Sequence, residues 1–148
     1  MKGQRASLVI RSLWAVCMLG AGFNHARVLL RHGLWWDYGG VTWPSAAYWT
    51  SLTFFDPLAA LLLFVRPKAG VALTAAIIAS NVAHNLGIVA HRAPGGEFLN
   101  HVASSPFVLS QIAFLLFVLA TAGTACIGTK ARGAAFLPEE PPSGSAES

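Results

Sequence analysis

Polar side chains interrupt an apolar stretch, from Lys68 to His91, that would otherwise suit a membrane span. At 100° per residue, Asn81, His84 and Asn85 fall on one side of a helix, together with His91. Ionisable and amide side chains are costly within a bilayer, so they usually face the interior of a bundle or a water-filled cavity. We therefore expect a helix with a polar face directed towards other spans.

Two other apolar stretches carry polar residues: Asn24 and His25 in one, and Asp56, followed by Pro57, in the next. An Asp at the centre of a bilayer costs roughly 3 kcal/mol on insertion scales. It must therefore be protonated, paired or in contact with water. We expect one polar pocket between the first three spans, with these members: Asn24, His25, Asp56, Asn81, His84 and Asn85.

Three uses of this pocket are compatible with its residue types. Asn, His and Asp can hydrogen-bond across helices and fix the bundle, at about 0.6–2 kcal/mol per contact. Imidazole and carboxylate groups can bind a ligand, a zinc, copper or iron ion, or a haem. His25, His84 and His91 are the candidate ligands, although no HxxxH or HExxH spacing is present. Finally, Asp56 beside a histidine could carry a proton through the membrane.

These patterns favour a non-enzymatic membrane protein with a structural or ligand-binding pocket. The alternatives are a haem- or metal-linked redox subunit and a proton-coupled small transporter. The sequence has no GxSxG motif, and Gly95-Gly96 lacks the Lys-Ser/Thr context of a phosphate loop. Cys17 and Cys126 lie in separate spans without CxxC spacing, so we expect buried thiols rather than a disulfide.

The composition places the chain in the membrane class. Of its 148 residues, 55% are hydrophobic and only 11% are charged, about half the charged fraction of a soluble domain. The net charge of +4 comes from Lys and Arg at the flanks of apolar stretches, with no basic run. The partner that this predicts is a lipid bilayer and not nucleic acid.

We predict an all-α, four-helix integral membrane bundle formed by residues 1–128. The expected spans are 8–30, 48–65, 69–90 and 107–127, each long enough to cross a bilayer with some tilt. A kink is expected at Pro57. The connector 32–47 holds most of the Trp and Tyr residues and should lie at the membrane interface. Residues 129–148 read as a disordered cytoplasmic tail.

The flanking charges also predict an orientation. Lys2, Arg5, Arg66, Lys68, Lys130 and Arg132 would share one side, and Arg27, Arg31 and Arg92 the other. The positive-inside rule makes the first side cytoplasmic. We therefore expect a multi-pass protein of the cytoplasmic (inner) membrane, with both termini inside and the pocket opening outward. Arg11 breaks the first apolar run, which favours a retained span over a signal peptide.

Small residues mark the side of the third span opposite its polar face. Ala75, Ala79, Ala83 and Gly87 fall on one stripe, and such stripes allow helices to approach closely. We expect this stripe to serve close packing, and it could join two copies of the chain in a homo-oligomer.

The stretches GFNHARVLLRHGLWW, YWTSLTFFDPLAALLLFVRPKAGVAL and SNVAHNLGIVAH resemble uncharacterised small bacterial four-span membrane proteins. The resemblance covers about residues 22–91 and implies an inner-membrane bundle without a known activity. In size and span number the chain is similar to DoxX-like proteins and to small multidrug-resistance transporters. The latter family carries its functional acid, a glutamate, in the first span; here the acid is Asp56, in the second.

Overall fold

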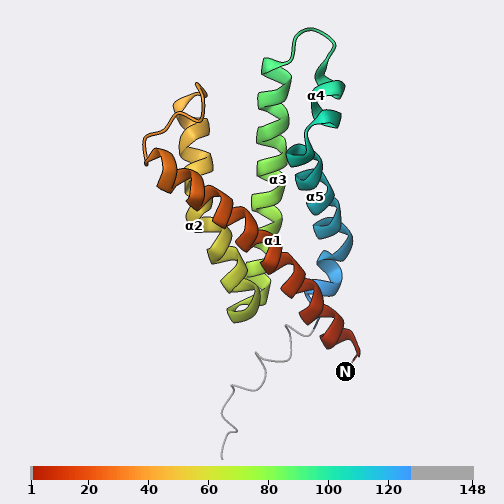
Figure 1. Ribbon diagram of the computed structural model, residues 1–148. Helices are drawn as coiled ribbons and strands as arrows, with labels where there is room; N and C mark the ends of the chain where they lie inside the picture. Colours follow the sequence, from red (N-terminus) through yellow and green to blue (C-terminus); the bar gives the residue numbers. More distant parts are fainter. Residues whose placement is uncertain (1, 128–148) are drawn as a thin grey trace, which may run out of the picture.

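The computed structural model describes residues 2–127, and the tail predicted for 129–148 lies outside the described residues. Figure 1 shows a bundle of helices joined by short connectors. In chain order they are α1 (Lys2–His32), α2 (Trp43–Val65), α3 (Pro67–Arg92), α4 (Phe98–Ser104) and α5 (Pro106–Ala125). No strand occurs within the described residues. The predicted all-α fold class is confirmed.

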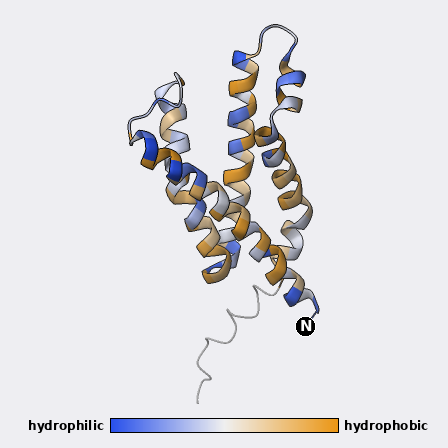
Figure 2. Ribbon diagram, in the orientation of Figure 1, coloured by the Kyte–Doolittle hydropathy of each residue, from blue (hydrophilic) through white to orange (hydrophobic). Residues whose placement is uncertain are grey.

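Four of these helices, α1, α2, α3 and α5, are long and apolar enough to cross a membrane. Their outer surfaces expose many large hydrophobic side chains, and Figure 2 shows apolar residues along the middle of each long helix. α2 begins at Trp43, earlier than the predicted start at Tyr48, because Pro44 occupies the first turn, where its fixed φ suits a helix. Pro57, where we expected a kink, lies inside α2, and the helix continues through it to Val65.

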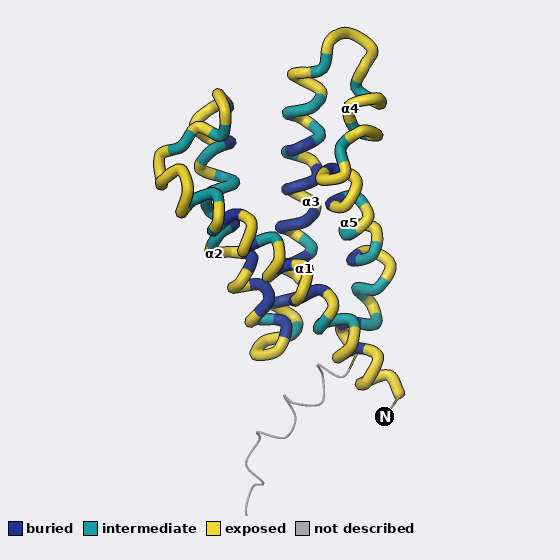
Figure 3. Tube along the Cα trace, viewed as in Figure 1, coloured by how far each residue is buried: buried dark blue, intermediate teal, exposed yellow. Residues whose placement is uncertain are grey.

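The helices are neighbours in a ring: α1 packs on α2 and α5, and α3 packs on the same two helices. In Figure 1, α1 runs obliquely across the others, from the N-terminus at the lower right to the upper left. Buried residues gather where the middle of α1 crosses the other long helices and along the inner side of α3 (Figure 3). Towards the connectors 33–42 and 93–97 the helices diverge.

Hydrogen bonds join the first half of α1 to the ends of α5 and α2, a region that we call the convergent end. The Ser7 hydroxyl donates to the Ala125 carbonyl at 2.9 Å, and the Trp14 indole N–H donates to the Thr121 hydroxyl at 3.2 Å. The Arg11 guanidinium donates to the Leu63 carbonyl at 2.8 Å, near the end of α2. The last carbonyls of a helix have no partner within the helix, so this bond satisfies one of them.

Ser7→Ala should lower the stability of the bundle by about 1 kcal/mol, because the buried Ala125 carbonyl would lose its donor. The measurement is the midpoint of thermal unfolding in mild detergent. Ser12→Ala is the matched control, since no hydrogen bond joins the Ser12 hydroxyl to another described residue. Equal midpoints for the two variants would contradict the role of Ser7.

The small-residue stripe of α3 does not pack within the described chain as predicted. Ala75 is half-buried, but Ala79, Ala83 and Gly87 are exposed, because the polar side of α3 faces the bundle. Close helix approach is made elsewhere. A Cβ on Gly22 would lie 3.1 Å from Pro57 Cδ, and a Cβ on Gly70 would overlap the backbone of α2.

Candidate functional site

A cavity of about 340 Å³ lies where α1 diverges from α5. All four long helices contribute to its wall. Its lining residues include Cys17, Met18, Gly20, Ala21, Asn24 and His25 from α1, Asp56 from α2, Ile77, Ile78 and Asn81 from α3, and Phe107, Ser110, Gln111 and Phe114 from α5. The predicted pocket between the first three spans is therefore completed by a fourth helix.

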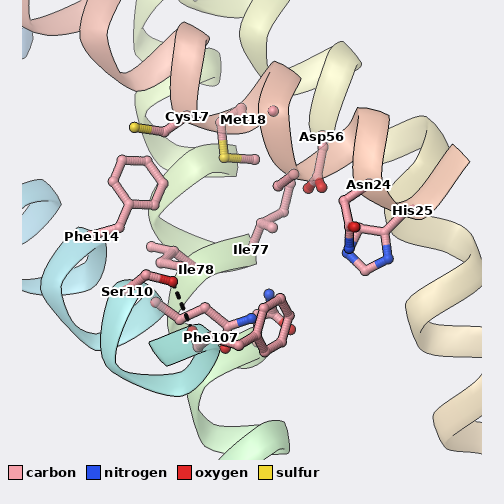
Figure 4. A pocket seen from close by; sticks show the side chains of 14 residues that line it. Cys17, Met18, Asn24, His25, Asp56, Ile77, Ile78, Phe107, Ser110 and Phe114 are labelled. Carbon is pink, nitrogen blue, oxygen red and sulfur yellow. Dashed lines mark hydrogen bonds between the residues drawn. The ribbon is translucent and has the colours of Figure 1, made fainter. Parts of the chain in front are cut away.

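Asp56 is buried in the middle of α2, with 2% of its surface exposed. Figure 4 shows its carboxyl directed into the cavity. Gly22 of α1 lies directly against its Cβ, so α1 and α2 approach closely at this level. No hydrogen bond or ion pair joins the Asp56 carboxyl to any residue in the range 2–127. A buried carboxyl without a partner is an unfavourable arrangement.

Asn24 and His25 line the same cavity from α1. His25 is 7% exposed, whereas Asn24 is exposed and lies at the rim. In the view of Figure 4 both side chains lie beside Asp56. Together with Asn81 of α3, four of the predicted pocket residues therefore line one cavity: Asn24, His25, Asp56 and Asn81.

An amide network forms the α3 and α5 side of the site. The Asn85 side-chain amide donates to Asn81 Oδ1 at 3.0 Å and to Gln111 Oε1 at 2.7 Å. All three side chains are buried, and the second bond joins α3 to α5. Asn81 and Gln111 line the cavity, while Asn85 connects them. Of the two predicted asparagines, Asn85 therefore makes the interhelical contact, and Asn81 bonds to it within α3.

Asn85→Ala should destabilise the bundle by about 1–2 kcal/mol, because the buried Asn81 and Gln111 oxygens would both lose a donor. Thermal unfolding in detergent measures the effect. Asn100→Ala, on the exposed surface of α4, is the control and should change the midpoint little. An unchanged midpoint in Asn85→Ala would show that the network contributes nothing to the bundle.

Sequence reasoning did not place Gln111 in the pocket. The signal was present, because Gln111 is the one strongly polar side chain of α5. A single polar residue in an apolar span usually faces other helices. The sequence did not indicate that α5 packs against both α1 and α3. This packing makes Gln111 a lining residue of the cavity.

His84 does not line the cavity. Its ring packs against two aromatic rings of α2: the ring centroid of His84 lies 4.8 Å from that of Tyr48 and 5.4 Å from that of Trp49. Its Nε2 atom is buried without a hydrogen-bond partner among the described residues. The Tyr48 hydroxyl forms a hydrogen bond with the Ser80 hydroxyl of α3 at 2.9 Å. The polar face of α3 is therefore divided, with His84 towards α2 and Asn81 towards the cavity.

The three histidines proposed as metal ligands are dispersed. His25 lines the cavity, His84 packs on α2, and His91 is exposed at the end of α3. His84 and His91 are about 10 Å apart along the helix axis, which exceeds what one ion can bridge. Within residues 2–127, no three His, Cys, Asp or Glu side chains are grouped to hold a metal ion.

Aromatic residues of the first connector form a continuous layer with the start of α2. Ring centroids are 3.9 Å apart for His32 and Trp36, 4.8 Å for Trp36 and Tyr38, and 5.2 Å for Tyr38 and Trp49. Tyr38 adopts a positive φ of 52°, and glycines at the two neighbouring positions 39 and 40 also have positive φ. This arrangement suits the interfacial location expected for Trp and Tyr.

The cysteines are exposed rather than buried, contrary to the prediction. Cys17 lies on the rim of the cavity, and Cys126 follows the end of α5.

Comparison with protein-family models, curated proteins and solved structures gives no match for this chain. A buried carboxyl, an imidazole and several amides facing an apolar space can bind a small amphipathic molecule.

Proposed function

We propose that the chain is an inner-membrane protein whose intramembrane cavity binds a small amphipathic molecule. With both termini cytoplasmic, the cavity lies in the outer half of the bilayer. The observation that supports this function best is the Asp56 carboxyl, buried at the cavity wall without a partner among the described residues.

A purely structural role explains the amides but not Asp56. Interhelical contacts stabilise a bundle when each polar group has a partner, as Asn81, Asn85 and Gln111 do. Asp56 carries the cost of burial without such a bond. A polar group kept in an unfavourable place is typical of a site that acts on a ligand. The volume of about 340 Å³ is within the range of small-molecule pockets.

The rim of the cavity indicates a route of entry from the bilayer. Cys17, Gly20 and Asn24 on α1 are exposed, as are Phe107 and Ser110 on α5. These residues border the opening between the two diverging helices. An apolar molecule dissolved in the membrane could pass between α1 and α5 and place its polar group against Asp56.

Cys17 provides a native reporter of occupancy. In a Cys126→Ser chain, Cys17 is the only thiol, and its alkylation by N-ethylmaleimide can be timed in nanodiscs. The probes are benzyltrimethylammonium and its uncharged isostere neopentylbenzene. We expect at least one of them to slow the alkylation in a saturable manner, because a bound molecule would cover the thiol.

Gly20→Phe is the control that fills the cavity. A Cβ at Gly20 would contact nothing within 4 Å, so a larger side chain can be placed there without moving the backbone. Saturable protection should disappear in this variant and persist in Gly87→Phe, which lies on the outer side of α3. Failure of both probes to protect Cys17 in the parent chain would refute the proposed function.

A second candidate function is proton-coupled transport. It is favoured by the position of Asp56 directly before Pro57, because Pro57 leaves the Thr53 carbonyl without its helical N–H partner and so weakens α2 there. A proton gradient should then drive movement of benzyltrimethylammonium into proteoliposomes. Loss of this uptake in Asp56→Asn would support transport, whereas binding without uptake would limit the protein to a receptor.

A further inference from the structure

We infer that the molecule bound in the cavity is a lipophilic organic cation whose charge pairs with the carboxylate of Asp56. This inference rests on the proposed binding function and specifies its ligand class. It depends on three features of the site: its charges, its apolar wall and the single carboxylate that it could offer to a metal ion.

The charges that face the cavity have one sign. Asp56 is the acid among the described lining residues, and no Lys or Arg lines the cavity with it. From α1 the ionisable groups on this wall are His25 and the Cys17 thiol, whereas α3 and α5 present none. Arg11 lies at the convergent end, where its guanidinium donates to the Leu63 and Ser7 carbonyls. A cation would therefore find a carboxylate that no Lys or Arg side chain already occupies.

An anionic ligand would be repelled by this carboxylate, and a neutral ligand would leave it buried without a counter-charge. Attraction between opposite charges is stronger at a buried site than in water, and the Asp56 side chain is only 2% exposed. The amide oxygens of Asn24 and Asn81 can add dipolar stabilisation around the same cation. The net preference is thus for one positive charge.

The remainder of the wall selects the body of the ligand. Met18, Ile77 and Ile78 supply an aliphatic surface, and Phe107 and Phe114 add two aromatic rings from α5. Such side chains bind apolar groups, and the faces of aromatic rings also attract cations. Figure 4 shows Phe114 and Asp56 on separate parts of the wall. A ligand with a cationic head and an aromatic or aliphatic body would contact both.

A metal cation fits this wall poorly. Calcium requires six to eight oxygen ligands, and magnesium retains several of its own waters in near-octahedral geometry. The cavity offers one carboxylate, and its other side-chain oxygens, from Asn24, Asn81, Ser110 and Gln111, are neutral. The Asn81 and Gln111 oxygens already accept hydrogen bonds from Asn85, so dehydration of a small ion would be poorly compensated. An organic cation loses much less hydration and gains the apolar contacts.

The test compares two probes of equal shape in the Cys126→Ser chain: benzyltrimethylammonium and neopentylbenzene. Protection of Cys17 from N-ethylmaleimide gives an apparent affinity for each. We expect Asp56→Asn to weaken protection by the cation at least about tenfold, equivalent to about 1.4 kcal/mol, and to leave protection by the neutral isostere unchanged. Asp56→Glu keeps the charge and should retain a preference for the cation.

The matched control is Asp37→Asn, the same chemical change at an exposed acid in the first connector. It should leave both affinities unchanged, and far-UV circular dichroism with size-exclusion chromatography checks that each variant is folded. If both probes protect Cys17 equally, with and without Asp56, the cation assignment is overturned while the binding function stands. If neither probe protects Cys17 in the parent chain, both the assignment and the binding function are overturned.

Discussion

Gly70→Ala is expected to disrupt the bundle, with a cost of at least about 3 kcal/mol, at the upper end of overpacking effects. A Cβ on Gly70 would overlap the backbone of Leu62 and Leu63, which has no flexible side-chain end that could move aside. The contact is tight because Arg66 alone separates α2 from α3. We expect a large fall in the midpoint of thermal unfolding in detergent, or loss of the monodisperse protein.

The same substitution at Gly87 provides the comparison. A Cβ at Gly87 would meet nothing within 4 Å, and glycine inside a helix is less favourable than alanine. Gly87→Ala should therefore leave the midpoint unchanged or raise it by the equivalent of about 0.4–1 kcal/mol. If Gly70→Ala proved as stable as Gly87→Ala, the close packing of α2 on α3 would be wrong.

Span number and helix type followed from hydrophobic pattern and length, because a membrane span must satisfy its backbone groups within the helix. Periodicity likewise placed Asn81 and Asn85 on the bundle side of α3, where both are buried. These are local properties, which the sequence of one helix determines. They required no knowledge of which helices are neighbours.

Pairing of the helices was harder to predict. His84 shares a face with Asn85 in a helical projection, yet its ring packs against Tyr48 while Asn85 bonds to Gln111. A face about 100° wide can contact two different neighbours, and the sequence does not state which helix covers which edge. For the same reason the small-residue stripe of α3 was not the place of close approach within the chain, which occurs at Gly22 and Gly70. Its use between two copies of the chain stays a prediction.

Asp56→Asn should raise the stability of the protein while it removes the preference for a cation. The substitution keeps the shape of the side chain and removes a buried ionisable group that has no hydrogen-bond partner among residues 2–127. Relief of part of the insertion cost of an Asp predicts a gain of about 1–3 kcal/mol. The midpoint of thermal unfolding, measured without added probe, should therefore increase.

This prediction separates a ligand site from structural support. If Asp56 held the helices together, its replacement would lower the midpoint, as Asn85→Ala is expected to do. Asp37→Asn serves as the reference for removal of one exposed acid. A lower midpoint for Asp56→Asn than for this reference would favour the structural role and weaken the proposed function.

We propose that the space between α1 and α5 is a ligand site organised around Asp56. Equilibrium dialysis of radiolabelled benzyltrimethylammonium against the unmodified chain in nanodiscs tests it most directly, with empty nanodiscs as the baseline. We expect saturable binding of one molecule per chain, which Asp56→Asn weakens at least about tenfold. Uptake that rises linearly with concentration, and equally in empty nanodiscs, would contradict it.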